Sequence, residues 1–193
     1  MDAANVEGST PLNPDDEAAL IPSHIESQEQ LNEWEQGNIA AAVSWLERKR
    51  PEQVLTMSFL RKLHKRMFDK TWRWAGTFRT SGTNLGVEPY EIQPELHKLL
   101  KDTEYWIEHK TYSDDEIAAR FHHRLVSIHP FPNGNGRHGR LMTEALQVQM
   151  GTERFTWGRT SLTKVGAART AYLAALQEAD RGRYDDLIAL ARS

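Results

Sequence analysis

Apolar residues recur at helical spacing along most of this chain, and that periodicity restricts its fold more than any other feature. Capping residues, prolines and glycines mark where the helical stretches begin and end. The pattern predicts helices over about 27–49, 56–68, 94–107, 113–128, 137–150, 161–180 and 184–192.

Residues 71–93 are the exception to the helical pattern. Trp72, Trp74 and Phe78 alternate with polar residues there, and glycines interrupt the segment. Alternation between turn residues predicts a short β-hairpin. We therefore expect a compact all-α domain with one small β-hairpin flap.

The chain has 193 residues and no cysteine, which excludes disulfides and thiolate chemistry. No apolar run approaches the ~20 residues that a membrane-spanning helix needs. The N-terminus lacks the basic and apolar regions of a secretory signal. We therefore expect a cytoplasmic protein that binds no membrane.

Acidic residues are concentrated at the start of the chain. Residues 1–47 hold ten Asp or Glu and neither Lys nor Arg, whereas residues 48–193 hold all 24 bases against 17 acids. We divide the chain into an acidic leader, residues 1–26, and a domain, residues 27–193. The leader is either a solvated tail or a segment that folds back over a basic, anion-binding site.

The stretch from His129 to Arg140 combines several groups that suit phosphate chemistry. Gly134 and Gly136 let the backbone approach a ligand closely, and a helix that starts directly after them presents its N–H groups to an anion. Arg137 and Arg140 are three residues apart, so both can face one side of the first turn and bind a di- or triphosphate. His129 precedes this nest, and its imidazole makes it the natural general base.

The same stretch resembles the signature of the Fic/Doc family, His-x-Phe-x-(Asp/Glu)-Gly-Asn-Gly-Arg-x-x-Arg. The segment from Trp74 to Arg79 is similar to the family's Trp-Ala-Gly-x-Phe-Arg segment. The resemblance covers roughly residues 35–190. The size of the chain and its acidic leader are similar to a small subgroup labelled mobile mystery protein B.

The resemblance implies a protein adenylyltransferase. Such an enzyme moves AMP from Mg-ATP to a Ser, Thr or Tyr hydroxyl of a target protein and releases pyrophosphate. By this resemblance His129 would take the hydroxyl proton and Phe131 would anchor the loop in the core. The residues implied to bind the nucleotide phosphates are Gly134, Asn135, Gly136, Arg137 and Arg140.

The resemblance also implies a metal ligand and a docking flap. Asn133 stands where family adenylyltransferases usually carry the Asp or Glu that holds Mg²⁺, and a neutral amide is a poorer ligand for a hard cation. The flap would register an extended target segment by strand addition. Its residues would be Val87, Glu88, Pro89, Tyr90, Glu91 and Ile92.

Other interpretations of these residues stay open. A Fic scaffold that binds nucleotide with little transferase activity would suit Asn133. Arg124 and His129 match the Arg-x4-His spacing of HEPN-type ribonucleases, although that reading leaves the Gly-Asn-Gly-Arg sequence unexplained. A histidine metal site is a third interpretation. No pair of these histidines has the His-x3-His helical spacing with a third ligand nearby: His122, His123, His129 and His138.

Regulation and partners follow only from the resemblance. Many family members are blocked by a glutamate, in a Ser/Thr-x-x-x-Glu-Gly/Asn motif, that pairs with the second arginine of the signature. This chain has no strict match, and Glu26 and Glu35 are the nearest candidates. The expected partner is a target protein with a modifiable hydroxyl; an antitoxin chain or a second copy are further candidates, and no direct nucleic-acid contact is expected.

Overall fold

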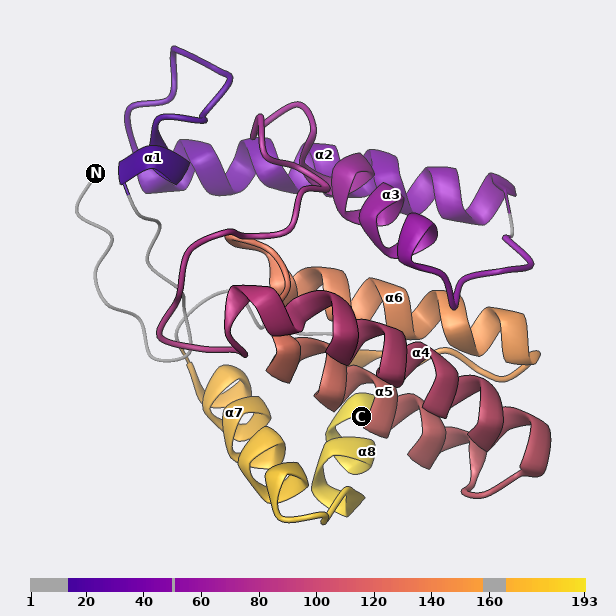
Figure 1. Cartoon of the computed structure of the whole chain (residues 1–193). Helices are drawn as coiled ribbons and strands as arrows, with labels where there is room; N and C mark the ends of the chain where they lie inside the picture. The colour runs from indigo at the N-terminus through magenta and orange to yellow at the C-terminus, as the bar shows by residue number, and fades with distance from the viewer. Residues whose placement is uncertain (1–13, 50, 158–165) are drawn as a thin grey trace.

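The structure, a computed structural model, describes residues 14–49, 51–157 and 166–193. Figure 1 shows helices joined by loops: α1 (Pro14–Glu17), α2 (Gln28–Lys49), α3 (Met57–Phe68), η1 (Pro89–Glu91), α4 (Ile92–His109), α5 (Asp114–Ile128), α6 (Asn135–Met150), α7 (Ala167–Asp180) and α8 (Asp185–Arg192). The described residues hold no β-strand, only an isolated bridge between Leu20 and Trp72. None of the helices described there is long and apolar enough to span a membrane. The predicted all-α class is confirmed.

Helix boundaries follow capping residues that are visible in the sequence. Thr56 Oγ1 accepts a hydrogen bond from Phe59 N at the start of α3 (3.1 Å), and Ser113 Oγ accepts one from Glu116 N at the start of α5 (3.3 Å). Gly151 ends α6 in the left-handed conformation, with φ of 74°. These caps each fix one end of α3, α5 or α6, and the motif loop joins the last two of these helices.

The predicted β-hairpin flap within residues 71–93 is wrong. The segment is an irregular loop that runs through η1 directly into α4. A capping box that begins at Glu88 starts η1, and Pro89 has no N–H to give to a strand ladder. The Val87 carbonyl accepts a hydrogen bond from the Arg79 guanidinium, so a side chain takes the place of a partner strand.

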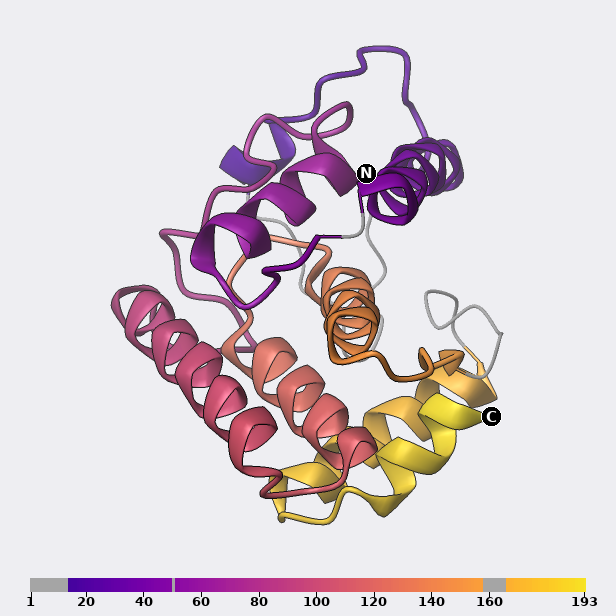
Figure 2. The same cartoon turned by 90° about the vertical axis from the view of Figure 1, so that its right-hand side faces the viewer.

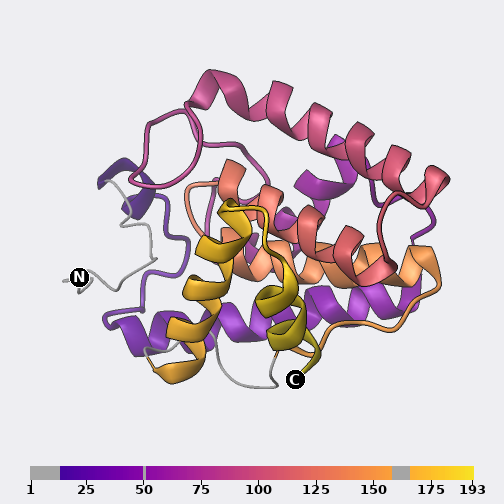
Figure 3. The same cartoon turned by 90° about the horizontal axis from the view of Figure 1, so that it is seen from below.

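Two hydrophobic clusters hold the helices together. The larger one joins α2 through α6 and the motif loop, and it includes the fully buried Leu60, Phe121 and Phe131. The smaller one joins α7 and α8 to α5 and includes Trp157 and Tyr172. α7 and α8 lie on the opposite side of α5 and α6 from α2 and α3 (Figures 1 and 2), and they are nearest the viewer when the molecule is seen from below (Figure 3). α5 and α6 are therefore central, and the loop between them carries the motif.

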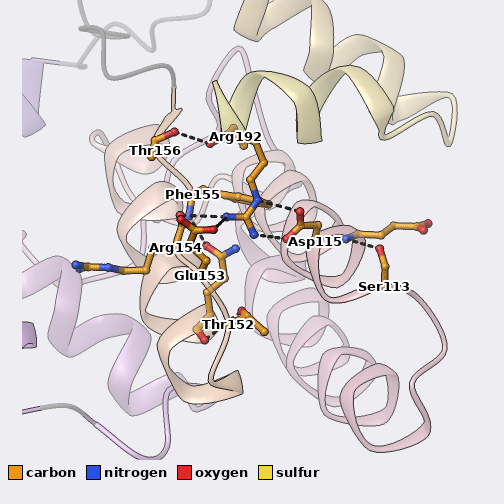
Figure 4. Close-up of polar contacts among 11 residues, drawn as sticks. Ser113, Asp115, Thr152, Glu153, Arg154, Phe155, Thr156 and Arg192 are labelled. Carbon is orange, nitrogen blue, oxygen red and sulfur yellow. Dashed lines mark hydrogen bonds and ion pairs between the residues drawn. The ribbon is translucent and has the colours of Figure 1, made fainter.

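The C-terminal helix α8 is fixed to the start of α5. Arg192 Nε donates to Asp115 Oδ2 at 2.9 Å, and another nitrogen of the same guanidinium pairs with the second carboxylate oxygen (Figure 4). The guanidinium also lies over the Phe155 ring, 4.8 Å from its centroid. Thr156 N donates to Ala191 O at 2.8 Å. Because a bidentate arginine–carboxylate pair is directional, it orients α8 and the preceding α7 on α5.

The described part of the acidic leader packs against the loop that follows α3. Ile21 N donates to Thr71 O at 2.8 Å, and Arg73 N donates to Ala19 O at 3.0 Å. Residues 1–13 of the leader lie outside the described residues. Its second half is therefore part of the folded domain and not a solvated tail.

Candidate active site

His129 lies at the turn between α5 and the motif loop. It ends α5 in the left-handed conformation, with φ of 55°, which residues other than glycine seldom adopt. The Arg79 guanidinium holds this turn: its Nε donates to the His129 carbonyl at 2.7 Å, and another nitrogen donates to the Val87 carbonyl. Gly86 packs so closely that an added Cβ would lie 2.6 Å from His129 Cβ. Contacts from the 79–87 loop therefore set the position of His129.

Burial keeps the His129 imidazole neutral near pH 7. Desolvation is the main cause that lowers the pKa of His129 to about 4, and the positive charge of Arg79 lowers it further. A hydrogen bond to the Val126 backbone acts in the opposite direction and raises the pKa. A neutral ring that donates one N–H to the backbone has an unprotonated second nitrogen. That is the protonation state that a general base needs.

The Asn135 side chain closes the motif loop. Its Oδ1 accepts from Phe131 N at 2.9 Å, and its Nδ2 donates to Phe131 O at 2.8 Å. Phe131 is fully buried and stacks on His64 with the ring centroids 3.6 Å apart, so it anchors the loop as the resemblance implied. Both polar groups of the Asn135 side chain serve the loop, so a phosphate contact by this residue would use its backbone N–H.

The N-terminus of α6 has no side-chain cap. Gly134 precedes it with φ of 77°, and an added Cβ there would lie 2.6 Å from Phe68 Cζ. Gly136 is in the first turn, where an added Cβ would meet only Arg140 Nη1, 3.8 Å away. N–H groups at the start of a helix, together with the helix dipole, attract an anion. The structure therefore places Arg140 beside a helix end that suits phosphate.

Arg137 is paired with a buried glutamate from α2. Its Nη1 lies 2.5 Å from Oε2 of Glu35, whose Oε1 accepts a hydrogen bond from Trp72 Nε1 at 2.7 Å. The Arg137 guanidinium also lies 4.9 Å from the Phe68 ring centroid, and its Nη2 reaches Asn133 Oδ1 at 3.4 Å. A guanidinium predicted to bind phosphate is therefore held by a carboxylate in this structure.

Arg140 is held from α7. Its Cζ lies 5.9 Å from the centroid of the Tyr172 ring. Burial lowers the pKa of Arg140, and interaction with the Tyr172 hydroxyl opposes that lowering. Arg137 and Arg140, which the sequence placed on one side of α6, are held by two different helices.

The sequence of this chain was compared with those of known protein families. Residues 54–147, which include the complete motif, match the Fic/DOC family. The chain carries a Fic/DOC domain. The resemblance to the Fic/Doc family is thereby confirmed over these residues, and the similarity to the mobile mystery protein B subgroup stays a prediction.

Two curated relatives named as protein adenylyltransferases are similar to parts of this chain. Protein adenylyltransferase Fic of Aedes aegypti is 34% identical over 79 residues, which are 39% of this chain and 16% of the relative. Protein adenylyltransferase fic-1 of Caenorhabditis elegans is 37% identical over 82 residues, 40% of this chain and 16% of the relative. The chain thus matches only 16% of the length of these relatives. They support adenylyl transfer as the chemistry of the family.

Two solved Fic structures share the fold. BepC from Bartonella tribocorum, with bound AMPPNP, superposes with a TM-score of 0.70 at 22% identity, covering 93% of this chain and 97% of that one. The N-terminal Fic domain of a protein named as a putative cell filamentation protein from Bartonella quintana, with bound ADP, has a TM-score of 0.69 at 23% identity, covering 88% of this chain and 86% of that one. At this identity the likeness shows the fold alone.

His64, which no sequence pattern singled out as a site residue, ties the Fic motif loop to α3. Its Nδ1 accepts a hydrogen bond from Gly76 N at 3.0 Å, so the ring proton is on Nε2, which donates to Asn133 O at 3.1 Å. Burial lowers the pKa of His64 well below its ordinary value. The available signal was a histidine within the apolar stripe of the predicted 56–68 helix.

Of the two predicted inhibitory glutamates, the structure brings Glu35 to the Fic motif. Glu26 is exposed near the start of α2, and its backbone N–H donates to Gln30 Oε1 at 2.8 Å. Among the residues that the structure describes, Glu26 forms no ion pair with either motif arginine. The family glutamate pairs with the second arginine, whereas Glu35 pairs with the first, Arg137.

The predicted docking residues do not share one environment in the Fic domain. Tyr90 is 77% exposed, whereas Ile92 is 1% exposed and belongs to the larger cluster, so the Ile92 side chain is not open to a docking partner. Val87 N donates to Ile128 O at 3.4 Å, which places this loop beside His129. The loop is adjacent to the proposed base, but it is not a hairpin.

The rival roles find little support in the contacts. Arg124 forms an ion pair with Glu95 at 2.9 Å, so the proposed ribonuclease arginine is engaged with α4. His123 contacts Asp180 at 2.7 Å, and His138 contacts the Leu60 carbonyl at 3.0 Å. Within the described ranges, no three His, Asp or Glu side chains are grouped to hold a metal ion.

Proposed function

We propose that this Fic domain transfers AMP from Mg-ATP to a hydroxyl group of a target protein. The observation that carries the proposal is the position of His129. Its neutral imidazole lies at the start of the loop that leads into α6, and the first two turns of that helix carry Arg137 and Arg140. A base, backbone N–H groups and two cations are the groups that such a transfer requires.

In the proposed reaction the target hydroxyl oxygen attacks the α-phosphorus of ATP. The bond from the α-phosphorus to the oxygen that bridges it to the β-phosphorus breaks, and pyrophosphate leaves. His129 accepts the hydroxyl proton. The N–H groups at the start of α6 face the phosphates, and the two arginines neutralise the outer ones. Positioning and charge stabilisation supply most of the catalysis in phosphoryl transfer.

We assign Mg²⁺ to the nucleotide substrate, not to a resident site. Asn133 Oδ1 already accepts a hydrogen bond from Gly134 N at 2.6 Å and lies 3.4 Å from Arg137 Nη2. An amide oxygen also adds no negative charge to a hard-cation site. These residues do not fit a metal ion held by the protein alone.

We further propose that Glu35 restrains the transferase. Its carboxylate occupies Arg137, one of the two cations assigned to the outer phosphates. The Trp72 hydrogen bond and the burial of Glu35, which is 5% exposed, hold the carboxylate there. A nucleotide phosphate must therefore displace Glu35 before it can pair with Arg137.

A second candidate function is nucleotide binding with little transfer. The Glu35–Arg137 pair and the amide at Asn133 favour it, because both weaken the part of the site that would hold a metal-bound triphosphate. It differs from the first candidate in predicting ATP binding without covalent labelling.

Labelled ATP and a lysate of the source cells separate the two candidates. We expect label on protein with the wild-type chain and no label with His129→Ala, while calorimetry shows ATP affinities within about twofold of each other, because a base removes a proton and does not bind the outer phosphates. Transfer retained in His129→Ala would show that His129 is not the base. ATP binding with no transfer by either chain would favour the second candidate.

A further inference from the structure

Tyr172 of α7 contacts Arg140 of the proposed phosphate site, although it lies outside the region that matches the Fic/DOC family. Its side chain is buried in the smaller hydrophobic cluster. Its hydroxyl oxygen lies 2.9 Å from His122 Nε2, and its ring centroid lies 5.9 Å from Arg140 Cζ. One tyrosine therefore connects a buried histidine of α5 to a motif arginine of α6.

The His122 ring fixes which way the Tyr172 hydroxyl points. Burial lowers the pKa of His122 to about 3, so the ring is neutral and one of its nitrogens carries a proton. Thr143 Oγ1 lies 3.4 Å from Nδ1 and donates its own proton to Gly139 O at 2.8 Å, so it can only accept from Nδ1, which is the protonated nitrogen. Nε2 is then an acceptor, and the Tyr172 hydroxyl must donate to it. The lone pairs of the hydroxyl oxygen are left for the Arg140 guanidinium.

Arg140 lies between Tyr172 and the start of α6. Its Nη1 is 3.8 Å from the Cβ position of Gly136, in the first turn. A long arginine side chain loses considerable rotamer freedom when it is held in one geometry. A hydroxyl that accepts a hydrogen bond from the guanidinium reduces the freedom that phosphate binding must still remove.

The elements around Tyr172 are packed closely enough to hold it in place. Gly139 lets α6 approach α5, since an added Cβ would lie 2.8 Å from Val126 Cγ1. Trp157 packs on His122 with ring centroids 4.4 Å apart. The Arg192 pair fixes α8, the helix that follows α7, to α5 (Figure 4). Tyr172 therefore lies in a closely packed part of the structure.

We propose that Tyr172, oriented by His122, is a positioning residue that holds Arg140 over the first turn of α6 for the outer phosphates of the nucleotide. The inference rests on the proposed function, because it assumes that Arg140 binds those phosphates. It extends the site beyond the motif to α7. It also makes the smaller hydrophobic cluster a determinant of preference for a triphosphate over a monophosphate.

The test is a double-mutant cycle on nucleotide binding. Tyr172→Phe removes only the hydroxyl, and we expect about a tenfold loss of ATP affinity by calorimetry, in the range for one hydrogen bond to a charged group, with AMP affinity within about twofold of wild type. In an Arg140→Ala background the same change should cause no further loss. Tyr184→Phe is the matched control, because Tyr184 packs in the same cluster but contacts Arg120.

The outcomes separate this inference from the function on which it rests. If Arg140→Ala weakens ATP but Tyr172→Phe does not, the positioning role is overturned and the phosphate role of Arg140 stands. If Arg140→Ala leaves ATP affinity unchanged, both are overturned. An equal loss from Tyr172→Phe with and without Arg140 would place the hydroxyl's effect elsewhere and overturn the inference.

A second measurement needs no nucleotide. The ¹⁵N resonances of the His122 ring report which nitrogen carries the proton and whether the other accepts a hydrogen bond. We expect a protonated Nδ1 and an Nε2 resonance that shifts in Tyr172→Phe but not in Tyr184→Phe. A protonated Nε2 in the wild type would mean that the Tyr172 hydroxyl accepts the hydrogen bond from His122, which would overturn the proposed orientation.

Discussion

Gly134 turns the chain from the motif loop into α6, and its conformation admits no larger residue without cost. Its φ is 77°, and an added Cβ would lie 2.6 Å from Phe68 Cζ. We expect Gly134→Ala to lower the free energy of unfolding by about 1–3 kcal/mol, because a left-handed non-glycine residue and a ring displacement both destabilise the fold. Urea denaturation measures this loss.

Gly136 is the matched control for Gly134. It is helical, and an added Cβ would meet only Arg140 Nη1 at 3.8 Å. Gly136→Ala should leave the fold as stable as wild type or slightly more stable, by up to about 1 kcal/mol, because alanine favours helix. Equal destabilisation by the two substitutions would contradict the assigned roles.

Asn133 is the residue at which this chain departs from the family signature, and in the proposed function it faces the metal of Mg-ATP. Asn133→Asp adds one negative charge beside the proposed nucleotide site. A carboxylate binds a hard cation more tightly than an amide does, so half-maximal transfer should occur at a lower Mg²⁺ concentration, by about tenfold. Titration of transfer against Mg²⁺ measures the change. An unchanged midpoint would mean that this position does not face the metal of Mg-ATP.

At the scale of elements, α2 supplies the carboxylate that occupies the motif. Glu35→Gln keeps an oxygen that can accept the Trp72 hydrogen bond but removes the charge that pairs with Arg137. We expect ATP affinity and transfer to rise about ten- to a hundredfold, which corresponds to the ~1.5–3 kcal/mol of a hydrogen bond to a charged group. Both are measured at equal folded fraction.

Glu26→Gln is the control for this change in α2. Glu26 is exposed, and the described residues show it in no ion pair with Arg137 or Arg140, so its substitution should leave transfer unchanged. A gain from Glu26→Gln together with no gain from Glu35→Gln would reverse the assignment of the restraining glutamate.

The elements also show how far the sequence could predict the site. Caps such as Ser113 and Gly151 act on neighbouring residues, so the helices flanking the motif were predictable from the chain itself. The Glu35–Arg137 pair joins residues 102 positions apart, and no local pattern encodes it. The alternating tryptophans suggested a hairpin, but the side chain of Arg79 satisfies carbonyls that a second strand would otherwise pair.

For the whole molecule, buried histidines predict acid sensitivity. Burial lowers the pKa of His64, His122, His129 and His138 below the ordinary value of 6.5. Between the unfolded pKa of about 6.5 and the folded values, the unfolded chain binds more protons than the folded one. Stability is therefore greatest above pH 6.5 and is lost as the pH falls from there toward 4.

His138→Gln tests this linkage. A glutamine amide can still donate to the Leu60 carbonyl that His138 Nε2 contacts at 3.0 Å. The slope of unfolding free energy against pH between 4.5 and 6 should fall by about 1.4 kcal/mol per pH unit, the contribution of one titrating histidine. Urea midpoints across this range measure the slope. A wild-type stability that does not change with pH would contradict the burial of these rings in neutral form.

The phosphate of ATP that reaches the target distinguishes adenylyl transfer from phosphoryl transfer. The Glu35→Gln chain and a lysate of the source cells are incubated in parallel with ATP labelled on the α- or the γ-phosphorus, and protein-bound label is measured. Relative to the lysate incubated without the chain, the chain should add label from the α position and none from the γ position, because the bond that breaks releases pyrophosphate. Label added from the γ position, or no label added from either while ATP binds, would contradict adenylyl transfer by this domain.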